Sequence, residues 1–248
     1  YDLSLSLRSS YRFTRLSWDG DSVFRTVVRV EGQPVVMDVG QVESSPPALE
    51  VFGTGGAGPS SLQQEAARML FGGLRLEPFY EQVRGHPLMG GVVGRLRGLK
   101  PSRPPSLFEM AVTAVTEQQI SMAAAYQIRT RLVEAFGDPI AVPTAEEGKA
   151  TYYAFPEPDC LVSLSTEALR ACGLSVRKAE YILGLAQAVA GGDVDLDGLA
   201  GRSDEDVRAV LTDLRGFGPW SADYILLRGL GRVDCVPASD LGVRTVVG

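Results

Sequence analysis

Cysteine and histidine are scarce in this 248-residue sequence. It contains three cysteines, Cys160, Cys172 and Cys235, and one histidine, His86. No two cysteines have the C-x-x-C spacing of a metal or redox motif, and this set cannot supply a four-ligand zinc site or a four-cysteine iron–sulfur cluster. We therefore expect no metal site built from side chains, no Fe–S cofactor, and free thiols in a reducing compartment.

Long hydrophobic runs are also missing. No stretch approaches the ~18 consecutive apolar residues that a membrane span needs. Asp2, Arg8 and Arg12 interrupt the N-terminal segment, so no signal peptide is visible. We expect no membrane partner and a cytoplasmic protein, associated with the nucleoid if it is bacterial. The 45% share of hydrophobic residues is enough to form a core, which excludes a disordered chain.

The sequence has no excess of positive charge. Its 24 Lys and Arg face 30 Asp and Glu, a net charge of -6. Because proteins that bind phosphate through many basic side chains are usually basic, the composition alone argues against a nucleic-acid partner. Residues 214–248, however, carry four arginines against three aspartates. The acidity therefore does not exclude DNA, and it predicts weak non-specific affinity with a shallow salt dependence.

The N-terminal part is typical of strands. Residues 23–30 are rich in β-branched side chains, a turn follows at 31–33, and residues 34–39 form a second apolar run, which together predict a hairpin. Residues 48–52 predict a further short strand. The first 80 residues are expected to be strands and loops, with helical spacing from Leu62 almost to the end of the chain.

Several predicted helices in the rest of the chain begin at a serine. A capping box at Ser106 opens one helix, a second spans about 121–136, and Ser165 and Ser203 open two more. The fold class is therefore α+β, an N-terminal antiparallel β-containing domain over residues 1–80 followed by a mainly α-helical body over 81–248.

Residues 215–220 (RGFGPW) break the helical pattern for one tight turn. Gly216 and Gly218 allow a positive φ and a close backbone approach to a ligand, and Pro219 suits the first turn of a new helix. Amides at that helix start can hold a phosphate without a basic side chain. An ordinary αα-hairpin with a glycine turn explains the bare motif equally well.

The surroundings of the turn are more specific. Residues 236–242 (VPASDLG) follow it, and together they closely resemble the helix-hairpin-helix DNA glycosylases, in particular the alkylpurine branch, the 3-methyladenine DNA glycosylase II type. Residues 108–136, with the segment EQQIS, and residues 169–185 resemble other segments of that family. The N-terminal strands resemble the extra β-domain of the branch.

This resemblance implies roles for individual residues. Asp240 matches the catalytic aspartate, and Trp220 and Tyr224 match positions that line the pocket for the extruded base. Gln119 matches the wedge position that fills the gap left by that base. Each residue also has a simpler structural interpretation. Trp220 and Tyr224 could be core residues, Gln119 could be an exposed helical residue, and Asp240 could be only a helix cap.

The resemblance also implies how DNA is bound. Gly216, Gly218 and the amides after them, including those of Trp220 and Ser221, match the hairpin that grips the phosphate backbone, often with a monovalent cation at the hairpin backbone. Arg177 and Lys178 could contact phosphate, although a solvated helix face is the simpler interpretation. The expected partner is double-stranded DNA with a damaged base, bound by a monomer.

The implied activity is that of a base excision repair enzyme that hydrolyses the N-glycosidic bond of alkylated purines. Trp220 stands where bifunctional relatives have a Schiff-base lysine, so no AP lyase activity is expected. The alternatives are an 8-oxoguanine-type glycosylase and a non-catalytic DNA-binding module. Family members continue for one or two helices beyond the position of Gly248, so C-terminal helices are expected to be missing.

Overall fold

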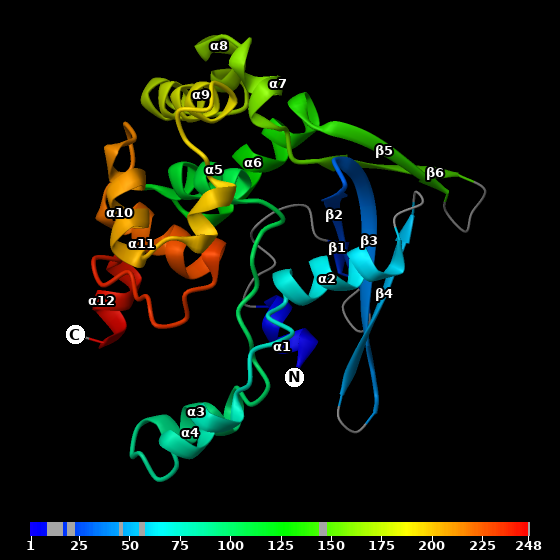
Figure 1. Cartoon of the computed structure of the whole chain (residues 1–248), viewed down its shortest axis with the longest axis vertical. Helices are drawn as coiled ribbons and strands as arrows, with labels where there is room; N and C mark the ends of the chain where they lie inside the picture. Colours follow the sequence, from blue (N-terminus) through cyan, green and yellow to red (C-terminus); the bar gives the residue numbers. More distant parts are fainter. Residues whose placement is uncertain (9–16, 19–22, 45–46, 55–57, 144–147, 248) are drawn as a thin grey trace. The chain divides into compact units, whose positions relative to one another are not determined.

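The computed structural model describes residues 1–8, 17–18, 23–44, 47–54, 58–143 and 148–247. The chain forms two compact units, Tyr1–Ser102 and Arg103–Gly248. Antiparallel strands make up the sheet of the first unit, and helices dominate the second (Figure 1). The predicted α+β class is confirmed.

The first unit contains a four-stranded antiparallel sheet in the order β1-β2-β3-β4. Its strands are β1 (Ser17–Trp18), β2 (Val23–Val30), β3 (Gln33–Val42) and β4 (Ala48–Thr54). Burial alternates strictly along β2, as expected for a strand with one face on a core. Glu31 and Gly32, both at positive φ, make the tight turn between β2 and β3. The predicted hairpin and third strand are confirmed.

The described residues of this unit also form the helices α1 (Leu3–Arg8), α2 (Pro59–Met69), α3 (Glu77–Gln82) and α4 (Met89–Arg95). The expectation of strands and loops before Leu62 was wrong for α1. Leu3 and Leu7 lie one helical turn apart and pack into the core of this unit, and the Asp2 carboxylate accepts from the Leu5 amide at 2.8 Å. A helix of 6 residues is too short to show a clear period in the sequence.

The boundary between the two compact units lies between residues 102 and 103, whereas the sequence pattern predicted a domain boundary between residues 80 and 81. Lys100 explains why the chain between these points stays with the first unit. Its amide donates to Ser6 Oγ at 3.0 Å, and its buried ammonium donates to the carbonyl of Phe71 at 3.0 Å. The Tyr80 hydroxyl also accepts from the Gly98 amide at 2.8 Å.

Helix α5 is the centre of the second unit. Every residue from Phe108 to Glu117 is buried, as expected for a helix that is covered on all sides. The other elements are α6 (Met122–Phe136), β5 (Asp138–Pro143), β6 (Lys149–Ala154), α7 (Pro158–Val162), α8 (Thr166–Ala171), α9 (Val176–Ala190), η1 (Asp197–Gly201), α10 (Asp204–Asp213), α11 (Pro219–Ile225), η2 (Leu226–Leu230) and α12 (Leu241–Val247). α5 contacts α6, α9, α11 and η2, so it joins segments far apart in the sequence.

The serine caps are confirmed. The hydroxyls of Ser106, Ser121, Ser165 and Ser203 each accept a hydrogen bond from the backbone amide three residues later, at 3.1 to 3.3 Å. Each bond satisfies an amide at a helix start that has no partner within the helix. These local bonds fix where α5, α6, α8 and α10 begin.

One expectation for the helical body was wrong. Helical spacing was expected from Leu62 almost to the end, but β5 and β6 form an antiparallel hairpin in which Ile140 pairs with Tyr152. Pro139 and Pro143 obscured the first strand in the sequence. Proline is compatible with strand ends and edges, where its missing donor costs no ladder bond.

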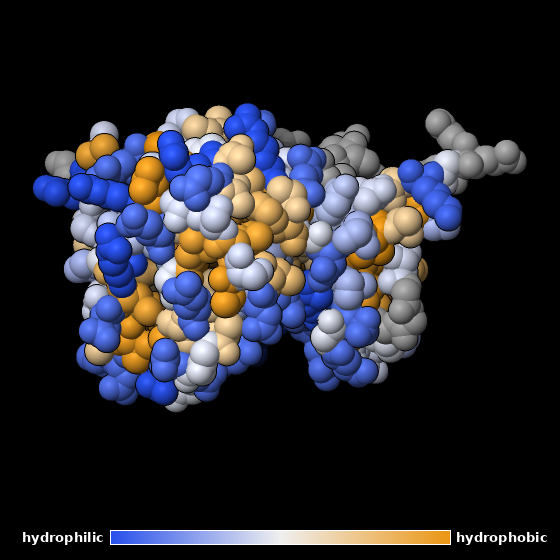
Figure 2. All heavy atoms as spheres, turned by 90° about the horizontal axis from the view of Figure 1, so that it is seen from above, coloured by the Kyte–Doolittle hydropathy of each residue, from blue (hydrophilic) through white to orange (hydrophobic). Residues whose placement is uncertain are grey.

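No helix among the described residues is long and apolar enough to cross a membrane. Figure 2 shows a face of the molecule on which hydrophilic and hydrophobic residues are interspersed.

Candidate active site

The glycine turn forms between α10 and α11. Gly216 has a φ of 96°, and a Cβ atom there would lie 2.3 Å from ring atoms of Tyr181. Only glycine fits this position, both for its backbone conformation and for its close packing. Gly218 caps α11 and faces open space, and Pro219 is the first residue of the helix. The first intrahelical bond, from Ala222 N to Gly218 O at 3.0 Å, leaves earlier amides available for a ligand.

Gln118 attaches the glycine turn to α5. Its Nε2 donates to the Gly216 carbonyl at 2.9 Å and to Ser221 Oγ at 3.2 Å. Ser221 is only 2% exposed as a whole residue, so both its backbone and its hydroxyl, which accepts from Gln118, are buried in this structure. Sequence reasoning assigned Gln118 no role. Its position in the segment EQQIS was the available signal, but its partners lie about a hundred residues further along the chain.

Gln119 occupies the junction between α5 and α6 in an uncommon conformation. Its φ is 55°, in the left-handed region that non-glycine residues rarely adopt. It is exposed, whereas Gln118 beside it is half-buried. The structure thus turns the side chain of Gln119 outward at the position that the resemblance assigned to a wedge, and such backbone strain tends to occur at functional sites.

Lys178 stabilises the same junction from α9. Its ammonium donates to the carbonyls of Thr116 at 2.9 Å and Gln118 at 2.6 Å, which places a positive charge at the C-terminal end of α5. Burial lowers the pKa of Lys178. The solvated-face interpretation therefore does not hold for Lys178, whose charge is bound to the backbone, but Arg177 is exposed as that interpretation expects.

Asp240 immediately precedes α12, and both of its carboxylate oxygens accept hydrogen bonds. Oδ1 accepts from the Val243 amide at 3.0 Å, and Oδ2 accepts from the Trp220 indole at 2.8 Å. Partial burial disfavours its ionised form, but these bonds and one from the Gly242 amide outweigh that effect and hold the pKa of Asp240 below its ordinary value. Asp240 is thus a helix cap and, at the same time, an ionised carboxylate that is oriented by a hydrogen bond from the Trp220 indole.

Trp220 and Tyr224, one helical turn apart on α11, form a stacked pair. Their ring centroids are 5.1 Å apart and their planes differ by 23°. The Tyr224 hydroxyl donates to Glu117 Oε2 at 2.9 Å, and burial, followed by the negative charge of Glu117, raises the pKa of Tyr224. Both side chains are half-buried, so each packs partly against the core and leaves part of its surface exposed.

A cleft of about 990 Å³ brings these groups together. Its lining contains the residues to which the resemblance assigned roles: Gln119, Gly216, Gly218, Trp220, Ser221, Tyr224 and Asp240. Arg177 and Lys178, the candidate phosphate contacts, do not line it. Glu117 and Gln118, which sequence reasoning left without a role, also line it. The cleft combines one ionised carboxylate, a stacked aromatic pair, the glycine turn at the start of α11 and a strained polar junction.

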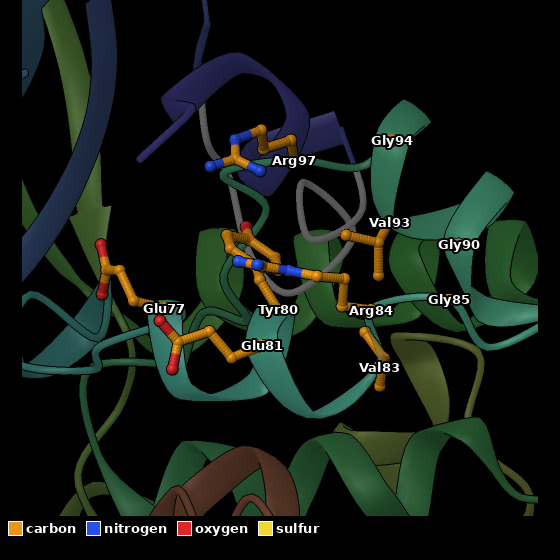
Figure 3. Close-up of a pocket in the computed structure, with 10 residues that line it drawn as sticks. All are labelled: Glu77, Tyr80, Glu81, Val83, Arg84, Gly85, Gly90, Val93, Gly94 and Arg97. Atoms are coloured by element: carbon orange, nitrogen blue, oxygen red, sulfur yellow. The ribbon is translucent and has the colours of Figure 1, made fainter.

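A second pocket lies in the first unit and lacks this chemistry. It has a volume of about 430 Å³ and lies between α3 and α4 (Figure 3). The Arg97 guanidinium lies 4.8 Å from the centroid of the Tyr80 ring at its wall. None of the nominated residues lines this pocket. Among the described residues, no cluster of His, Cys, Asp and Glu could hold a metal ion.

Comparison with known proteins connects the cleft to a family. Residues 112–248, which include every residue of the cleft lining, match the HhH-GPD superfamily of base excision DNA repair proteins. The chain belongs to this superfamily. The match covers more than half of the sequence, and it includes the α5–α6 junction, the glycine turn and Asp240 of this HhH-GPD protein.

Individual relatives extend the likeness. The chain is 34% identical over 168 residues to a DNA-3-methyladenine glycosylase of Bacillus subtilis, a match covering 68% of this chain and 54% of the relative. This HhH-GPD protein therefore spans about half the length of that curated relative.

Solved structures match both units of the chain. A 3-methyladenine DNA-glycosylase from Archaeoglobus fulgidus matches 99% of this chain and 81% of its own, with a TM-score of 0.84 and 26% identity. A second structure is an 8-oxoguanine glycosylase/lyase of Clostridium acetobutylicum in complex with double-stranded DNA. The match covers 100% of this chain and 79% of that protein. Its TM-score is 0.81 and its identity 15%, so this likeness concerns the fold alone.

Proposed function

We propose that this protein is a monofunctional DNA glycosylase that removes alkylated purines from double-stranded DNA in base excision repair. The observation that carries the proposal is the ionised carboxylate of Asp240, presented to the cleft by Trp220 at 2.8 Å. The 3-methyladenine glycosylases among the similar proteins support the same substrate class.

The first step is extrusion of the damaged base from the helix. Unstacking costs a few kcal/mol, and less for a damaged base. Gln119, exposed at its strained junction beside the cleft, would fill the gap left in the stack. The glycine turn, held to α5 by Gln118, would bind the backbone phosphate through its amides.

The second step is cleavage of the N-glycosidic bond. Positive charge develops on the sugar as the base departs, and a fixed carboxylate aimed at that charge stabilises the transition state. Asp240 is suited to this task because its two hydrogen bonds favour the charged form and fix its orientation. The same carboxylate can orient or deprotonate the attacking water.

The stacked aromatic pair would receive the base. Trp220 and Tyr224 offer π surfaces next to Asp240, and such surfaces attract the electron-poor ring of an alkylated purine. No lysine is among the described residues that line the cleft, which argues against the Schiff-base chemistry of a glycosylase/lyase. An 8-oxoguanine-type enzyme is accordingly the less supported alternative.

The proposal includes a monomer acting without a redox cofactor, and a monovalent cation at the backbone near Gly216 and Gly218. The Gly216 carbonyl accepts from Gln118, and a carbonyl oxygen keeps a second lone pair for a cation. Comparing DNA affinity in potassium and in a bulky organic cation at equal ionic strength tests this part of the proposal.

The decisive experiment measures base release from a panel of duplexes that carry 3-methyladenine, 7-methylguanine, hypoxanthine or ethenoadenine, resolved by chromatography. The wild-type protein is expected to release alkylated purines, and Asp240→Asn to release none while still binding DNA. Binding without any release by the wild type would favour a non-catalytic DNA-binding module. Unchanged release by Asp240→Asn would refute the assigned mechanism.

A further inference from the structure

Glu117 is a buried acidic residue that the proposed mechanism does not use. It is the last residue of the central helix α5, its side chain is only 3% exposed, and it lines the same cleft as Asp240. Acidic side chains are rarely buried without a specific partner. A buried charge pair is also weak evidence for stability, since an apolar pair of similar volume often serves as well. The position of Glu117 therefore calls for a functional explanation.

Each oxygen of the Glu117 carboxylate contacts a different side chain. Arg129 Nη1 lies 2.9 Å from Oε1, and the Tyr224 hydroxyl donates to Oε2 at 2.9 Å. Burial raises the pKa of Glu117, while Arg129 and the Tyr224 hydroxyl act in the opposite direction. The guanidinium contact favours the ionised carboxylate, because a positive charge 2.9 Å from a carboxylate oxygen stabilises its charged form.

The bond from Tyr224 to Glu117 changes the tyrosine ring. A hydroxyl that donates to an ionised acceptor forms a strong bond and is polarised by it. Electron density moves toward the oxygen and into the ring, so the negative face of the ring becomes stronger. Tyr224 stacks on Trp220, with centroids 5.1 Å apart, and the altered ring is therefore part of the aromatic surface of the cleft.

We propose that Glu117 is a specificity-determining residue that acts through Tyr224 and makes the aromatic surface of the cleft favour positively charged purines over neutral ones. This inference rests on the proposed function, in which the extruded base enters the cleft. The ligand class is a cationic, N-alkylated purine such as 7-methylguanine, as opposed to a neutral damaged base such as hypoxanthine. Cation–π attraction depends on the strength of the negative ring face, whereas apolar stacking of a neutral base depends on it far less.

The test compares single-turnover release of 7-methylguanine and hypoxanthine from otherwise identical duplexes. Tyr224→Phe keeps the ring, the stack and the Glu117–Arg129 pair, and removes only the hydroxyl that donates to Glu117. Tyr152→Phe, on β6 and outside the cleft lining, is the matched control. Thermal melting of each variant establishes that it is folded.

We expect the ratio of the two release rates, cationic over neutral, to fall about fivefold in Tyr224→Phe and to stay at the wild-type value in Tyr152→Phe. A merely structural role for the hydroxyl would lower both rates together and leave the ratio unchanged, which would overturn the inference. A wild-type preference for hypoxanthine would overturn it as well.

Failure of the proposed function gives a different result, because the wild-type protein would then release neither base. If hypoxanthine is not released at all, ethenoadenine, which is also neutral, replaces it in the ratio. A fivefold fall of that ratio in Tyr224→Phe, with no change in Tyr152→Phe, supports the inference, and an unchanged ratio refutes it.

Discussion

The Trp220 indole donates a hydrogen bond of 2.8 Å to the Asp240 carboxylate across 20 residues of sequence. One aromatic side chain thus contributes both a stacking surface and the orientation of the proposed catalytic group. The second oxygen of Asp240 is fixed by the start of α12. Because all of these donors favour the charged carboxylate, Asp240 is charged and oriented in this structure, as the proposed reaction requires.

Trp220→Phe tests this relationship through the pKa of Asp240. Removing the indole donor is expected to raise that pKa toward its ordinary value and to slow base release about tenfold, the effect of losing one bond to a charged group. Since the pKa of Asp240 is depressed in the folded protein, the carboxylate stays active until the pH falls through that low value. The loss of activity should begin at higher pH in the variant.

The carboxyl ¹³C resonance of Asp240, followed as the pH is lowered, measures this shift directly. Tyr224→Phe is the control for the titration, because Tyr224 bonds to Glu117 rather than to Asp240. An unchanged Asp240 titration in Trp220→Phe would contradict the role of the indole.

Gly216→Ala should destabilise the protein by about 2 kcal/mol, because the backbone at φ 96° is strained for alanine and the new methyl group meets the Tyr181 ring. Urea unfolding measures the change. Gly218→Ala is the matched control, since its methyl group would enter open space and should alter the free energy of unfolding by less than about 0.5 kcal/mol. Equal effects at the two glycines would show that the close packing against Tyr181 has no consequence.

Gln119→Gly should show separately how the positive φ affects stability and how the side chain affects base excision. Glycine adopts the φ of 55° without penalty, so stability is expected to stay the same or rise by up to about 1 kcal/mol. Excision from duplex DNA should fall, because no side chain remains to occupy the gap. Base extrusion can be followed with a fluorescent base beside the lesion.

Glu31→Gly provides the control for that prediction. Glu31 also has a positive φ, 52°, but it lies in the β2–β3 turn. It should show the same stability change with no loss of excision. If Gln119→Gly keeps full activity on duplex DNA, Gln119 is not the wedge.

Arg129→Met should cost about 3 kcal/mol or more of unfolding free energy, because it removes the guanidinium that pairs with the buried carboxylate of Glu117. Arg215→Met removes an arginine from the exposed pair with Glu180, whose side chains are 75% and 37% exposed. That variant should lose less than about 1 kcal/mol. Chemical denaturation of both variants side by side distinguishes a buried pair from a surface one.

Borohydride trapping tests the prediction that the protein has no AP lyase activity. Because Trp220 rather than a lysine follows Pro219 at the start of the second hairpin helix, no Schiff base should form with the DNA sugar, and reduction should yield no covalent adduct. A bona fide glycosylase/lyase serves as the positive control. A trapped adduct would show that this protein has an amine nucleophile and that its proposed assignment as monofunctional is wrong.

Local chemistry in the sequence determined much of the fold. Serine caps, the β2–β3 turn and the glycine turn before α11 depend on residues within a few positions of each other, so their residue types indicated them directly. α1 and the β5–β6 hairpin escaped notice because one is too short for a periodic signal and the other contains prolines.

The sequence by itself, through motif and resemblance, also nominated the residues that turned out to line one cleft. It did not determine how they are held. The bond from Gln118 to Gly216 and the bond from Tyr224 to Glu117 each join residues about a hundred positions apart. Lys178 binds the end of α5 from α9. Such contacts exist only once α5 is enclosed by α9 and α11, because packing of distant segments, and not local propensity, brings these side chains within bonding distance.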